Sequence, residues 1–317
     1  MNCLNPRMGG TMSASARVSI VKADVREVGI RSAIDLLGDE RPTFAGRDVV
    51  LKPNFNSADP FPAGTHNDTL ESLIRLLQED VPSSITVAER SGGAWKSHEV
   101  ADMKGVRPIF DALDVNYIVL DDLAAEDWTL VPLEGSHWER GIEVPQLVLD
   151  ADSIVMTCCL KTHGFGGHFT MSLKNAVGFV ALESRADGYK YMRELHTSPH
   201  QRSMIAEINQ VFRPDLIVLD ALSAFISGGP SEGDLVHPGL ILASTDRIAL
   251  DAVGVAILRN YETTPEVLSG AVFEQEQIRR AVQLELGVAT PDDIELVPAQ
   301  DRESCDWADL IRQKLSD

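Results

Sequence analysis

Three short runs of this sequence are apolar without a break: residues 49–51, 154–156 and 216–219. A strand with one face in water alternates apolar and polar residues, whereas a strand covered on both faces does not. Segments with apolar residues at helical spacing alternate with these runs, such as residues 68–77, where Asp68 is the expected N-cap. This order predicts an α/β fold with a mostly parallel central sheet and helices on both faces.

The length of 317 residues suits one large domain or two of modest size. We expect residues 1–16 to form a flexible N-terminal tail, because they lack the basic region and apolar stretch of a signal peptide. We expect residues 17–317 to form a single α/β domain. Two lobes that meet near residue 150 are the alternative.

The charge balance limits the partners of the chain. Its 28 Lys and Arg residues against 48 Asp and Glu residues give a formal net charge of −20. A field of this sign repels nucleic acid and anionic membranes, so we expect neither as a partner. No apolar run approaches the roughly 18–20 residues that span a bilayer. An anionic ligand would therefore need a local cluster of Lys, His and backbone N–H groups.

The cysteines indicate the compartment. Four occur, none of them in a C-x-x-C pair, so neither a disulfide framework nor an iron–sulfur cluster is predicted. This favours a reducing cytoplasm. The sequence leaves open whether the protein is a homo-oligomer.

Ionisable and amide side chains directly follow the predicted strands. They are Lys52, Asn54, Asn56, Glu89, Lys161 and Asp220. In open parallel sheets, ligands lie beyond the carboxyl ends of the strands. The sequence therefore predicts a ligand site at this edge of the sheet.

The densest polar cluster covers residues 161–175. Its glycines allow the backbone to wrap closely around a ligand. Lys161 and Lys174 could neutralise a phosphate or carboxylate, and His163 could act as general acid or base because histidine titrates near neutrality. We predict these three residues to be catalytic. The predicted substrate-binding residues are Lys52, Asn54, Asn56, Thr162, Ser172, Asn175 and Gly229.

Four residues are candidates for holding a divalent metal ion: His66, His196, Glu89 and Asp220. Their spacing matches no H-E-x-x-H or similar motif, so histidines that form ordinary hydrogen bonds are the alternative. The chain also lacks a P-loop, the G-x-G-x-x-G dinucleotide fingerprint and the G-x-S-x-G nucleophile motif.

Seven motifs occur in order along the chain: residues 49–54 (VVLKPN), 65–66 (TH), 160–163 (LKTH), 170–178 (TMSLKNAVG), 195–196 (LH), 229–233 (GPSEG) and 244–251 (STDRIALD). Together they resemble the domain-of-unknown-function family 362, over about residues 18–260. The resemblance implies one recurring pattern that includes Lys52, Asn54, His66, Lys161, His163, Lys174, Asn175, His196 and Asp251. Some members of that family carry a ferredoxin-like module with iron–sulfur cysteines. This chain lacks those cysteines and resembles the stand-alone form, so no cluster is expected.

Two functional hypotheses follow. The first is an enzyme that acts on a small anionic metabolite, carrying a carboxylate or phosphate, through Lys and His residues at strand ends. A divalent metal ion is an optional cofactor, and the reaction class is open among isomerase, lyase and hydrolase. The second is a non-catalytic protein that binds a metal or cofactor in order to store or deliver it.

Overall fold

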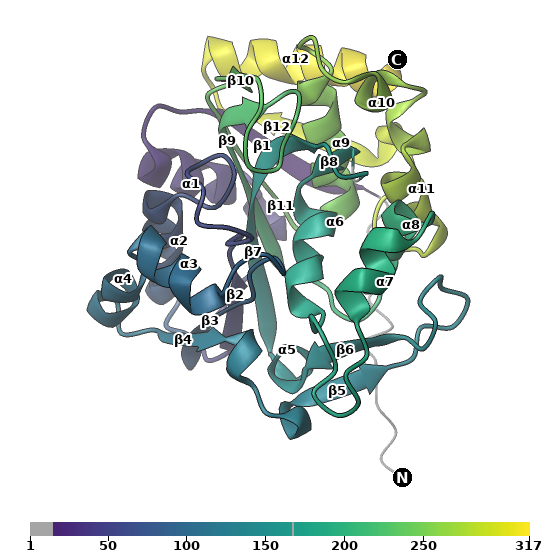
Figure 1. Cartoon of the computed structure of the whole chain (residues 1–317). Coiled ribbons are helices and arrows are strands. Elements are labelled where there is room, and N and C mark those ends of the chain that lie inside the picture. The colour runs from purple at the N-terminus through teal and green to yellow at the C-terminus, as the bar shows by residue number, and fades with distance from the viewer. Residues whose placement is uncertain (1–14, 167) are drawn as a thin grey trace.

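The computed structural model describes residues 15–166 and 168–317. Within them, a ten-stranded sheet forms the centre of the molecule (Figure 1). From edge to edge its main strands are β12 (Ile294–Pro298), β1 (Ala16–Lys22), β11 (Leu240–Ser244), β9 (Leu216–Phe225), β7 (Ser153–His163), β2 (Asp48–Lys52), β3 (Ser84–Glu89) and β4 (Asn116–Val119). Two short strands, β8 (His168–Thr170) and β10 (Leu235–Val236), pair with β7 and β9. A separate hairpin consists of β5 (Trp128–Val131) and β6 (Ile142–Pro145).

The centre of the sheet is parallel, as the apolar runs predict. Strands β4, β3, β2, β7 and β9 run in the same direction, and only β11 and the two short strands pair antiparallel with their neighbours in this sheet. The three apolar runs lie side by side, because Leu51 pairs with Val155 and Met156 pairs with Ile217. All eleven residues of β7 are buried, since helices cover both faces of the sheet.

Helices on the two faces bury separate apolar clusters (Figure 1). One face is covered by α1 (Arg26–Asp35), α2 (Asn67–Glu79), α3 (Ser97–Lys104) and α4 (Arg107–Ala112). The other is covered by α5 (Gln146–Asp150), α6 (Ser172–Asn175), α7 (Tyr191–Thr197), α8 (Gln201–Ile208), α9 (Arg247–Leu258), α10 (Pro265–Leu268), α11 (Glu276–Gln283) and α12 (Arg302–Ser316). Short 3-10 helices are η1 (Gly38–Glu40), η2 (Leu120–Asp122), η3 (Ala125–Asp127), η4 (Ala176–Phe179), η5 (Val272–Glu274) and η6 (Pro291–Asp293). The predicted α/β architecture is therefore confirmed.

Two details of the prediction differ from the structure. Helix α2 is capped by His66 rather than by Asp68, because the ring Nδ1 accepts a hydrogen bond from the Asp68 backbone N–H at 3.1 Å. The predicted tail lies outside the described residues as far as residue 14, and Ala16 is already a buried residue of β1. The division into one domain or two lobes stays a prediction. No helix in the described part of the chain is long and apolar enough to cross a membrane.

Candidate functional site

A cleft of about 430 Å³ lies beyond the carboxyl ends of β2, β3 and β7. The predicted site residues that line it are Lys52, Asn54, Asn56, Glu89, Lys161, His163, Lys174, Asn175 and His196. They come from segments far apart in sequence because the parallel strands end at one edge. The structure thus brings most of the predicted residues together, but it gives them different tasks.

Lys52 and Glu89 form a buried ion pair at the ends of β2 and β3. The Lys52 Nζ lies 2.6 Å from a Glu89 carboxylate oxygen, and it also donates to the Pro53 carbonyl at 2.9 Å and to the Asn175 side-chain oxygen at 3.3 Å. Burial lowers the pKa of Lys52, and the Glu89 charge opposes that shift. Three acceptors already use the three protons of the ammonium group. Lys52 therefore holds parts of the cleft lining together and has no free proton to donate to a ligand.

The Glu89 carboxylate also has several hydrogen-bond partners. It accepts the backbone N–H groups of Phe55 and Arg90, each at 2.8 Å, in addition to Lys52. These bonds join the loop after β2 to the loop after β3. Because a buried carboxylate needs such partners, Glu89 holds the two loops together.

Lys161, at the end of β7, is buried and faces backbone carbonyls. Its Nζ donates to Pro62 at 3.1 Å and to Ala63 at 2.5 Å, and no carboxylate is among these contacts. Burial lowers the pKa of its ammonium group. Lys161 therefore fastens the loop between β2 and α2 against the cleft and contributes positive charge to it.

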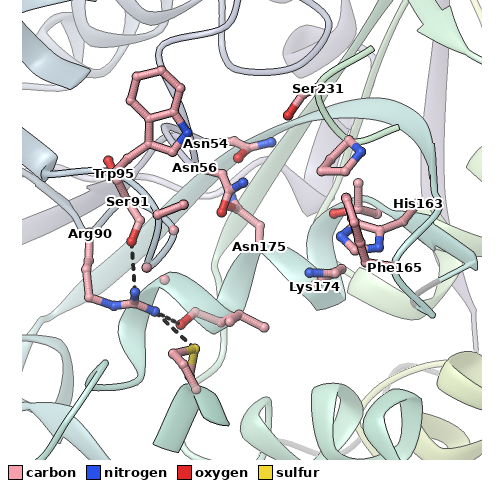
Figure 2. Close-up of a pocket in the computed structure, with 18 of the residues that line it drawn as sticks. Asn54, Asn56, Arg90, Ser91, Trp95, His163, Phe165, Lys174, Asn175 and Ser231 are labelled. Carbon is pink, nitrogen blue, oxygen red and sulfur yellow. Dashed lines mark hydrogen bonds between the residues drawn. The ribbon is translucent and has the colours of Figure 1, made fainter. Parts of the chain in front are cut away.

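Lys174 differs from the other two lysines. Within the described residues, no hydrogen bond or ion pair reaches its ammonium group, which lines the cleft next to His163 (Figure 2). Burial, and secondly the charge of Lys161, lower the pKa of Lys174 to about 8. A cation in this position has unused hydrogen-bond donors directed at whatever enters the cleft.

Ser172 and Asp251 hold the helix that carries Lys174. Asp251, fully buried on α9, accepts the Ser172 hydroxyl at 2.5 Å and the backbone N–H groups of Ser172 and Leu173 at 2.8 and 3.1 Å. Burial raises the pKa of Asp251 to about 6. Ser172 was predicted to bind substrate, but its hydroxyl faces Asp251 and it does not line the cleft.

His163 and His196 are the two histidines of the cleft. His163 is 8% exposed, and within the described residues its buried Nδ1 has no hydrogen-bond partner. Burial, followed by the charges of Lys174 and Lys161, lowers the pKa of His163 to about 2, so its ring is neutral. The His196 Nδ1 lies 2.6 Å from the Met192 carbonyl, which can only accept. In neutral His196 the proton is therefore on Nδ1, and the lone pair is on Nε2.

Thr162 and Gly229 lie next to the cleft lining and hold its parts together. The Thr162 hydroxyl lies 3.3 Å from the Phe225 carbonyl, and the Gly164 N–H donates to the Gly229 carbonyl at 3.1 Å. Gly229 has a positive φ of 66°, and a Cβ there would lie 2.1 Å from the Thr162 carbonyl oxygen. These contacts join β7 to the loop that supplies Pro230 and Ser231 to the lining, whereas Thr162 and Gly229 themselves do not line it.

The structure does not gather the four residues predicted to hold a metal ion. Glu89 and His196 line the cleft, whereas the His66 Nδ1 caps α2 and Asp220 binds Arg26 at 2.8 Å and Thr69 at 2.6 Å. Over residues 15–166 and 168–317, no group of three or more His, Cys, Asp or Glu side chains is arranged to hold a metal. The predicted set therefore does not fit a metal centre in this geometry.

Several lining residues were missed by sequence reasoning. Arg90 is buried, and its guanidinium binds the carbonyls of Val180, Ser91 and Val177 at 2.8–3.0 Å; Figure 2 shows the bond to Ser91. It directly follows Glu89 at a strand end, which was the available signal. Trp95 and Phe165 lie on loops after β3 and β7, and an aromatic residue in a loop gives no comparable signal.

Comparisons with known proteins identify the family of this chain. The family model described as "Domain of unknown function (DUF362)" matches residues 49–256. This chain belongs to that family. The match contains β7, α6 and β2 from residue 49 onward, and these elements carry the three lysines of the cleft.

Two individual proteins are also similar to this chain. A thylakoid-associated protein of Synechocystis sp. (strain ATCC 27184 / PCC 6803 / Kazusa) is 25% identical over 257 residues, which is 76% of this chain and 74% of that protein. The lactate racemase apoprotein from Thermoanaerobacterium thermosaccharolyticum is 14% identical, with a TM-score of 0.42 over 65% of this chain and 50% of that one. At this level the second similarity carries no argument about function.

Proposed function

We propose that this protein is an enzyme that binds a small anionic metabolite, bearing a carboxylate or phosphate, and transfers a proton to or from it. The observation that carries the proposal is Lys174. It is a partly buried cation without a counterion among the described residues, and it lies beside two histidines in a cleft at the carboxyl edge of the sheet.

The charges of the lining favour an anion. Lys52, Lys161, Lys174 and Arg90 contribute four cationic side chains, and Glu89 is the one acidic side chain among the lining residues. Lys52 and Glu89 neutralise each other, which leaves a positive surplus. In a protein of net charge −20, this surplus gives small anions a local binding place while the remaining field repels polyanions.

The proton chemistry follows from the same charges. Without a bound anion His163 is a weak base, first because its ring is buried and second because the charges of Lys174 and Lys161 disfavour its protonation. A bound anion would offset those charges and raise the pKa of His163, so that the ring becomes a better base when substrate is present. His196 offers a second lone pair, at Nε2. Proton transfer of this kind serves isomerases, lyases and hydrolases alike.

The test begins with binding. Isothermal titration of the full chain with acetate and inorganic phosphate measures affinity, with Lys174→Met against the control Lys314→Met on α12, whose lysine pairs with Asp317. Loss of one charge-assisted hydrogen bond, about 1.5–3 kcal/mol, should weaken binding by about 10- to 150-fold in the first variant and leave the second unchanged. Equal affinities in the two variants would contradict the proposal.

Catalysis is tested separately from binding. Anions that bind are screened for solvent deuterium incorporation by NMR, and His163→Gln should abolish the exchange while retaining most of the affinity. Exchange that persists unchanged in His163→Gln would remove His163 from the proposed role.

A further inference from the structure

The cleft is larger than an anionic group alone requires. Its volume of about 430 Å³ falls in the range of about 300–1,000 Å³ that encloses molecules of metabolite or drug size. The Lys174 and His163 end provides the contacts for one phosphate or carboxylate. The rest of the cleft therefore has room for the body of the ligand.

Two aromatic side chains line the cleft, Phe165 next to the polar end and Trp95 away from it (Figure 2). Trp95 is 36% exposed, and Phe165 is 73% exposed although phenylalanine usually buries most of its surface. They come from different loops, and Figure 2 shows them on opposite sides of the cleft. The Phe165 ring also contacts the His163 ring edge-on, with centroids 5.9 Å apart. The aromatic surface is thus continuous with the polar end.

Polar side chains lie between the aromatic ones in the same view. Asn54 and Asn56 both line the cleft (Figure 2), and each amide offers hydrogen-bond donors and an acceptor. Such groups suit the substituted edge of a ring better than an aliphatic chain.

We propose that the ligand of this cleft carries a flat aromatic or heteroaromatic ring, held by Trp95 and Phe165, in addition to its anionic group. The inference rests on the proposed function and narrows its substrate class. Aromatic pairs add affinity beyond the area that they bury, and the amides of Asn54 and Asn56 orient the ring edge.

Calorimetry on the full chain tests the proposal with two matched series. The first is inorganic phosphate, phenyl phosphate and cyclohexyl phosphate, and the second is acetate, phenylacetate and cyclohexylacetate. In at least one series the phenyl compound should bind tenfold or more tightly than the bare anion, and more tightly than the cyclohexyl compound. Trp95→Ala and Phe165→Ala should each remove about two- to tenfold of that advantage and leave the bare anion unaffected. Leu130→Ala, an exposed apolar residue on β5, is the control and should change nothing.

The outcomes separate the two proposals. If bare anions bind in a Lys174-dependent manner but the phenyl compounds bind no more tightly, the ring is refuted and the proposed function stands. If cyclohexyl and phenyl compounds bind equally, or if the phenyl advantage survives both aromatic substitutions, the flat-ring assignment is wrong. If no compound of either series binds, both proposals fail.

Discussion

Replacing Glu89 by Gln tests the contribution of the buried Lys52–Glu89 ion pair to stability. The substitution keeps the shape of the side chain but removes the charge 2.6 Å from the Lys52 Nζ, where Lys52 and Glu89 are 1% and 2% exposed. Removing one member of a buried ion pair costs about 3–5 kcal/mol, because the other charge stays buried without compensation. The amide also turns a donor toward either Lys52 or the Phe55 N–H.

Urea denaturation followed by circular dichroism measures this loss. The control is Glu71→Gln, which removes the exposed partner of Arg75 on α2 and should cost about 0.5 kcal/mol or less. Lys52→Met combined with Glu89→Gln should be more stable than Glu89→Gln alone, because no charge is then left unpaired.

The pH dependence gives an independent check. Burial already lowers the pKa of Lys52 below 10.5, and loss of Glu89 lowers it further. Between the folded and unfolded pKa values the unfolded chain binds more protons, so stability rises with pH in that interval. The deficit of Glu89→Gln should therefore shrink as the pH rises from 7 toward 10. A deficit at pH 7 no larger than that of Glu71→Gln, about 0.5 kcal/mol or less, would refute the reasoning.

Two further predictions concern the helix that carries Lys174. Acetate keeps its charge above pH 6, so its affinity should fall as the pH rises through about 8, where the Lys174 ammonium loses its proton, and Lys174→Met should show no such fall by calorimetry. Asp251 has a folded pKa raised to about 6 from 3.8, so the folded state holds more protons in this interval and wild-type stability declines as the pH rises from 4 to 6. Denaturation curves of Asp251→Asn should lack this decline. Its acetate affinity should also be reduced, because Ser172 and α6 lose the hydrogen bonds to Asp251. An unchanged pH profile of stability would contradict the assignment.

The sheet edge was predictable from local sequence. The apolar runs predict strands covered on both faces, and a polar residue directly after a predicted strand must lie at the strand end. For this reason the positions of Lys52, Glu89 and Lys161 around the cleft follow from the sequence. The residues Trp95 and Phe165 do not, because a loop residue carries no periodicity that shows which way it faces.

The different interactions of similar residues were not predictable. Site roles are predicted for three lysines, yet Lys52 is neutralised by Glu89 and Lys161 is held by the carbonyls of residues 62 and 63. Lys174 alone of the three has no such partner among the described residues. Ser172 was expected to face the ligand, but Asp251, 79 residues away in sequence, takes its hydroxyl.

The α/β class, the central parallel strands and the edge at which polar residues collect all follow from the sequence alone. These depend on side-chain periodicity and strand ends, which are properties of neighbouring residues. The tertiary structure decided which charges are paired, which histidines share the cleft, and that His66 and Asp220 serve elsewhere. The physical reason is that a charge is satisfied by its nearest partner in space, and that partner lies 37 residues from Lys52 and about 100 residues from Lys161.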